Sequence, residues 1–171
     1  MSERSAEVLR AMGSTALVLT CALWAGPAAA DQLSTFTALL NGAQETPPVA
    51  SPSQGVAFMT FDKDNSNLCY AISYSPLAST EILAHFHGPA APGQAAPVLH
   101  NISPSPSPFG SPKHGCVVLT KDEIKFLKKG QLYINVHSTT APNGEIRGQV
   151  LPEKPKYKAP AIGSTSGAFL D

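Results

Sequence analysis

Hydrophobic and polar residues alternate in short runs along most of the chain. In the run 55–62, Ala57, Met59 and Phe61 share one face, and Val56, Phe58 and Thr60 share the other. Alternation with a period of two indicates a half-buried β-strand. A second run at 68–74 follows after a short polar turn, so the two runs predict a β-hairpin.

Other short runs of the same kind are bounded by glycine, proline and asparagine. They predict strands at 36–40, 82–87, 97–102, 115–119, 131–137 and 144–150. Many short strands separated by Pro/Gly turns predict an all-β fold, an antiparallel β-sandwich. A barrel is the alternative way in which these strands could bury their apolar faces.

One segment departs from strand periodicity. Thr120 and Glu123 have the spacing of a helix capping box. Ile124 and Leu127 add a short apolar stripe, and Gly130 suits the position just after a helix end. We therefore expect one short helix before the last two strands.

The first 30 residues have the features of a signal peptide. Arg4 and Arg10 precede the apolar run 16–24, and an A-x-A pattern ends at Ala30. The apolar run is shorter than the roughly 20 residues needed to span a bilayer. We expect residues 1–30 to be cleaved, leaving no transmembrane helix in an exported protein that is periplasmic or secreted.

The rest of the chain divides into one domain and a tail. Residues 31–151 are enough for one hydrophobic core, whereas residues 152–171 are rich in Pro, Lys, Ser and Gly and predict a flexible segment. The 12 basic and 12 acidic residues balance. Without a basic stripe, nucleic acid is not an expected partner.

Export bears on the cysteines. Cys21 leaves with the signal peptide, so Cys69 and Cys116 remain. An even number of cysteines in an exported protein favours a disulfide. Both lie in strand-like runs, so the bond would tie two strands together. The alternative is a pair of buried free thiols.

Three of the five histidines lie in strand-like runs. His85 and His87 are two residues apart, so their side chains point to the same face, and His137 ends another run. Imidazoles from neighbouring strands suit Zn²⁺ or Cu²⁺. The alternative is a polar structural cluster in which these histidines hydrogen-bond the backbone or Glu145.

Glu145 and Arg147 share one face of the last strand. We interpret them as a charge pair, or as an arginine that reaches backbone carbonyls, that fixes the final hairpin, and as candidates for a second layer around the histidines. A catalytic role would require Glu145 as general base beside a metal-bound water. His100 and His114 have no spacing that argues for a site, and the sequence contains no phosphate-binding loop or nucleotide fingerprint.

Four segments together resemble the CHRD domain, a module named after its repeats in chordin. They are Leu40 to Val49 (LNGAQETPPV), Ala84 to Ala90 (AHFHGPA), the helix region Leu119 to Gly130, and Leu132 to Ser138 (LYINVHS) with Asn143 to Gln149 (NGEIRGQ). The resemblance spans about residues 32–151. It implies export and a β-sandwich-like fold, and no catalytic reaction defines the family.

The pattern and the resemblance lead to one set of expectations. The fold is a Greek-key antiparallel sandwich of the immunoglobulin or superoxide dismutase type. The protein acts as a non-enzymatic binding or structural module that binds copper or zinc through its histidine cluster. Its partner is an unidentified protein or an envelope or matrix component. The alternatives are a small metalloenzyme, redox or hydrolytic, and an adhesion or matrix-associated protein.

Overall fold

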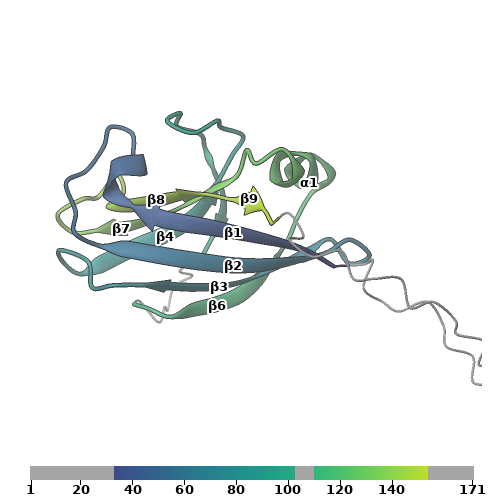
Figure 1. Ribbon diagram of the computed structural model, residues 1–171, viewed down its shortest axis with the longest axis horizontal. Coiled ribbons are helices and arrows are strands. Elements are labelled where there is room, and N and C mark those ends of the chain that lie inside the picture. The colour runs from purple at the N-terminus through teal and green to yellow at the C-terminus, as the bar shows by residue number, and fades with distance from the viewer. Residues whose placement is uncertain (1–32, 103–109, 154–171) are drawn as a thin grey trace, which may run out of the picture.

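A computed structural model describes residues 33–102 and 110–153, which form one continuous antiparallel sheet (Figure 1). The strands are β1 (Leu33–Asn41), β2 (Gln54–Asp62), β3 (Asn67–Tyr74), β4 (Glu81–His87), β5 (Val98–Asn101), β6 (Lys113–Val118), β7 (Tyr133–Ser138), β8 (Ile146–Gln149) and β9 (Leu151–Pro152). The short turn η2 (Gly42–Gln44) and the helix α1 (Lys121–Lys128) complete the elements. The expected signal peptide and almost all of the expected tail lie outside the described residues.

The strand order explains how the sheet closes. It runs β5-β4-β7-β8-β1-β2-β3-β6, with β9 beside β1. Because β1 pairs with β2 along its length and with β8 at its end, the two halves of the sheet are continuous and curl into a nearly closed barrel. The all-β antiparallel fold and the short helix before the last strands are confirmed. The sheet curls in the manner of the barrel, which was the alternative to two separate sheets packed as a sandwich.

Alternate residues of each strand fill the barrel. Ala57, Met59 and Phe61 of β2 are buried as the period-two pattern predicts, and Phe58 between them is 58% exposed. The same alternation holds in β1, whereas the last four residues of β4 are all buried. The largest buried apolar side chains are Leu40, Met59, Phe61, Leu68, Ile72, Phe86, Leu127, Leu132, Ile134 and Ile146.

Strands β7 and β8 differ because every one of their residues is buried. One face of each lines the barrel. Loops cover the other face, since Arg147 Nη1 donates to Thr46 Oγ1 and Gln149 Nε2 donates to the Ala90 carbonyl. We call the outer side of β4, β7 and β8 the covered face. It holds the buried polar side chains of His85, His87, Asn135, His137, Arg147 and Gln149.

The helix forms where its sequence signals predict it. The Thr120 side chain accepts from the Glu123 backbone N–H, and the Glu123 carboxylate accepts from the Thr120 N–H, so the capping box is complete. Gly130 follows with φ +66°, the left-handed backbone that ends many helices. Among the described residues, no helix has the length and apolar character needed to cross a membrane.

Side chains rather than backbone hydrogen bonds close the gap between the two ends of the sheet. Lys113 of β6 lies 2.7 Å from Glu81 of β4, and both side chains are buried. Tyr74 of β3 donates to Glu81 at 2.6 Å. In the core, the Tyr70 ring meets Phe86 edge-on with centroids 5.5 Å apart. A buried ion pair and an aromatic contact therefore join β3 and β6 to β4.

The expected disulfide is present. Cys69 of β3 and Cys116 of β6 face each other directly in the strand register and are bonded. Disulfides persist mainly in oxidising compartments. The bond therefore points to a protein that works outside the cytoplasm.

Candidate metal centre

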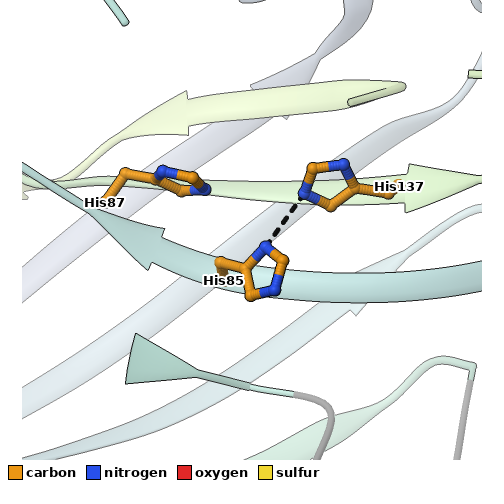
Figure 2. A group of neighbouring side chains, drawn as sticks. All are labelled: His85, His87 and His137. Atoms are coloured by element: carbon orange, nitrogen blue, oxygen red, sulfur yellow. Dashed lines mark hydrogen bonds between the residues drawn. The ribbon is translucent and has the colours of Figure 1, made fainter. Parts of the chain in front are cut away.

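The three strand histidines lie together on the covered face (Figure 2). His85 and His87 project from the same side of β4. His137 reaches them from the neighbouring strand β7, where it lies opposite Leu83 in the register and so diagonal to His85. All three are at least nine-tenths buried. Pairing of β4 with β7 brings His137 into one cluster with residues at least fifty positions away in sequence.

The spacing of the ring nitrogens suits a shared ion. His85 Nδ1 lies 3.0 Å from His137 Nε2, and one nitrogen from each ring falls within 4.8 Å of the others. Two nitrogen ligands about 2.0–2.1 Å from one ion, at roughly 90–110°, lie about 2.9–3.4 Å apart. The first pair is thus at ligand spacing, and a nitrogen of His87 lies within 4.8 Å of both.

Backbone carbonyls orient two of the rings. His87 Nδ1 lies 2.9 Å from the Ala96 oxygen, and His137 Nδ1 lies 3.0 Å from the Pro142 oxygen. A carbonyl only accepts, so each Nδ1 carries the proton and each Nε2 keeps a lone pair. Buried His87 Nε2 has no hydrogen-bond partner. Metal-binding histidines are commonly held in this way, with the other ring N–H bonded to a carbonyl.

The electrostatics keep the cluster neutral. Burial, together with smaller effects of the neighbouring His137 and His87, lowers the pKa of His85 to about 4. The pKa values of His87 and His137 are also lowered, chiefly by burial. Neutral imidazoles are the form that coordinates a metal, so at neutral pH protons compete little for these nitrogens.

The other two described histidines lie elsewhere. His100 of β5 faces Phe86 in the register, and its Nε2 lies 3.2 Å from Glu123 of the helix. His114 is exposed on β6. Within the described ranges no fourth His, Cys, Asp or Glu joins the cluster. A tetrahedral ion held there would keep one position for water or another small ligand.

Glu145 holds loops rather than a ring nitrogen. Its Oε1 accepts from Ser51 Oγ at 2.7 Å, Ser53 Oγ at 3.2 Å and the Ala78 N–H at 2.8 Å. Burial opposes its ionisation, but the hydrogen bonds outweigh burial and lower its pKa. The carboxylate thus anchors two loops beside the final hairpin. The Nδ1–H of His137 donates to the Pro142 carbonyl and not to Glu145.

Arg147 reaches the cluster through Tyr133. The guanidinium carbon lies 3.5 Å from the centroid of the Tyr133 ring, and that ring stacks on His87 with centroids 4.8 Å apart and planes at 3°. Because β7 lies between β4 and β8, the tyrosine ring lies between imidazole and guanidinium. Sequence reasoning missed Tyr133 as a site residue, although alternation places it on the same face as His137.

Glu45 is a buried residue of the loop that follows η2, which the sequence suggested as a rigid structural loop or a binding surface. Its loop lies against the final hairpin, where a Cβ on Gly144 would fall 2.5–2.7 Å from the Glu45 carboxyl atoms. Gly144 also has φ +126°, so only glycine fits. Burial raises the pKa of Glu45 from its usual 4.5 to about 7, although Arg147 and the Thr46 backbone oppose the shift.

Replacing Glu45 by glutamine is expected to change how stability depends on pH. The folded protein holds the Glu45 proton more tightly than the unfolded chain does. That contribution is full below pH 4.5 and is lost as the pH rises to about 7. Glu45→Gln should lack this loss. In urea unfolding, the free energy of unfolding of the variant relative to the wild type should therefore rise by on the order of 2 kcal/mol between pH 4.5 and 8.

The histidines titrate in both proteins, so the difference between the two curves isolates Glu45. Glu153→Gln, at an exposed position, is the matched control and should show no such gain. Parallel curves for Glu45→Gln and the wild type would contradict a buried Glu45 carboxyl that becomes charged only near neutral pH.

The fold and cluster define a class: an all-β, disulfide-bonded domain with three buried histidines on a loop-covered face. The model of the CHRD domain family matches residues 36–150. The chain therefore belongs to the CHRD domain family, as its four motifs suggested. No curated protein and no solved structure matches it.

Proposed function

We propose that this CHRD protein binds one copper or zinc ion through His85, His87 and His137, and that it acts outside the cytoplasm as a non-enzymatic binding or structural module. One observation carries the proposal. Two buried imidazoles are fixed by backbone carbonyls so that each keeps a lone pair on Nε2, and one of these lies at ligand spacing from the third ring.

The donor set favours late first-row metals. Imidazole nitrogens suit copper and zinc, whereas calcium and magnesium prefer oxygen ligands. No carboxylate belongs to the cluster in the described part of the chain. For a given nitrogen site Cu²⁺ generally binds more tightly than Zn²⁺, so we expect copper to displace zinc.

Calorimetric titration of the metal-free, untagged protein with Cu²⁺ and Zn²⁺ tests the proposal. One ion should bind per chain. Outer hydrogen-bond partners of ligands alone are worth 10–100-fold in affinity, so His85→Ala, His87→Ala or His137→Ala should each weaken binding by on the order of a hundredfold or more.

His114→Ala is the matched control, because it removes an exposed imidazole from β6 and should leave affinity unchanged. The proposal fails if the wild type shows no saturable binding. It fails equally if all three ligand variants bind as tightly as the control.

A metalloenzyme is the second candidate, and the three-ligand count favours it. An ion held by three histidines keeps a position at which water or substrate can bind. Azide should then perturb the visible spectrum of the copper form, and the loaded protein should turn over superoxide or an activated ester. A copper spectrum unmoved by azide, with no turnover, favours the non-enzymatic module.

A further inference from the structure

The half of the sheet that does not carry the histidines turns an apolar surface to solvent. Strands β1, β2, β3 and β6 lie side by side there, with the short β9 beside β1 (Figure 1). We call the outer side of these five strands the apolar face. Among the described residues seven large hydrophobic side chains are exposed, and five of them belong to this face, each more than half exposed: Leu33, Leu39, Phe58, Val118 and Leu151. Exposed apolar side chains gathered in this way mark an interaction surface.

The strand registers join these side chains into one continuous surface. The middle row crosses all five strands and consists of Leu151, Thr37, Phe58, Ala71 and His114. Leu39 lies opposite Val56 in the row on one side. The Cys69–Cys116 disulfide lies in the row on the other side. The apolar side chains therefore form a single patch across the strands.

The apolar face is almost free of charge. Asp62, at the end of β2, is the one charged outward residue of the described strands β1, β2, β3 and β6. Glu153 follows β9 at the border of the face. In a two-fold symmetric contact each patch meets a copy of itself, so a charge near the axis would face its own copy and oppose pairing. An uncharged face thus fits a second copy of this chain better than a charged partner.

A groove of about 350 Å³ lies beside Phe58 on this face, and Thr35, Thr60 and Cys69 contribute to its lining. A cavity of about 150 Å³ already holds a benzene molecule, so the groove has room for a phenylalanine ring. An exposed ring and an apolar groove lie next to each other on one surface. That surface is therefore complementary to a copy of itself.

The extent of the face matches a small dimer interface. The nine-residue strands β1 and β2 are about 30 Å long, and four strands side by side span about 19 Å. Packing two such faces together buries roughly 1,100 Å² in total, just above the ~1,000 Å² expected of a specific interface. The area therefore suits a dimer that dissociates on dilution.

We propose that a second copy of this chain covers the apolar face, through a two-fold symmetric contact in which the β1, β2, β3 and β6 strands of two copies pack face to face. Sheets packed in this way keep their strand directions within about 30° of each other. The Phe58 ring of each copy enters the groove of the other. The proposal does not depend on the metal site, because the histidine cluster lies on the covered face.

Sedimentation equilibrium of the untagged, metal-free protein over a range of concentrations is the test. We expect a mass of two chains at high protein concentration, falling to one chain on dilution through the micromolar range. Phe58→Lys should weaken the association at least about a hundredfold. The change removes an aromatic anchor and buries a charge, and in a two-fold contact it acts twice.

Val98→Lys is the matched control. Val98 is also more than half exposed, but it lies on β5 in the other half of the sheet, so its variant should associate as the wild type does. Leu39→Lys makes the same change at a second exposed position of the apolar face and should also weaken the association. It provides the answer if Phe58→Lys does not fold, which circular dichroism checks.

Three results would overturn the proposal. The first is a mass of one chain at every concentration of the wild type. The second is association of folded Phe58→Lys or Leu39→Lys as tight as that of Val98→Lys, which would place the contact elsewhere. The third is a wild type that stays monomeric but binds phosphatidylcholine vesicles, which would mean that a lipid surface covers the face.

Discussion

Replacing Lys113 by methionine is expected to lower the free energy of unfolding by about 3–5 kcal/mol. Lys113 and Glu81 form a buried ion pair at 2.7 Å. It joins β6 to β4, two strands near opposite ends of the sheet. Methionine keeps the length and apolar stem of lysine but leaves the Glu81 carboxylate buried without its cation. Urea unfolding followed by circular dichroism measures the change.

Lys125→Met is the matched control. Lys125 also forms an ion pair, with Asp122 at 2.8 Å, but the two side chains are 67% and 72% exposed. Exposed pairs of this kind contribute at most about 1 kcal/mol. Equal losses in Lys113→Met and Lys125→Met would show that the buried pair does not hold the barrel closed.

Removal of the disulfide is expected to cost roughly 4 kcal/mol, because the bond closes a loop with a sequence separation of 47. Cys116 is exposed and Cys69 is half-buried, so the double variant Cys69→Ser/Cys116→Ser leaves no core cavity. The effect should therefore come mainly from greater freedom of the unfolded chain. Thermal and urea unfolding of the variant and of the wild type provide the measurement.

The reduced wild type serves as an independent check on the serines. It should unfold at nearly the same urea concentration as the double variant. If reduction and substitution both leave the free energy of unfolding unchanged, the disulfide contributes no stability, and the pairing of β3 with β6 is stable without it.

Local patterns predicted the elements well. The alternation around Ala57, Met59 and Phe61 identified β2 and its buried face, and the spacing of Thr120 and Glu123 identified the start of the helix. These signals succeed because each depends on neighbours within a few residues. Alternation is less informative in β7 and β8, where both faces are buried, since a polar residue there can be either solvated or covered by a loop.

Part of the candidate metal site could be predicted from the sequence. His85 and His87 share a face because strand side chains alternate, which needs no tertiary information. That His137 lies beside them requires the register of β7 against β4. Tyr133 was not predicted as a site residue because a tyrosine has no spacing signature until its stacking on His87 is known.

By itself the sequence determined the family, the strands and helix, the cysteine pair and the three histidines that could meet. Each follows from short-range periodicity, capping chemistry or ordered motifs. Tertiary structure decided that the sheet closes as a barrel, because β1 pairs on both sides. It also decided that the loop bearing Glu45 covers β8 and buries Arg147. Those features depend on contacts between segments about a hundred residues apart, which local pattern does not encode.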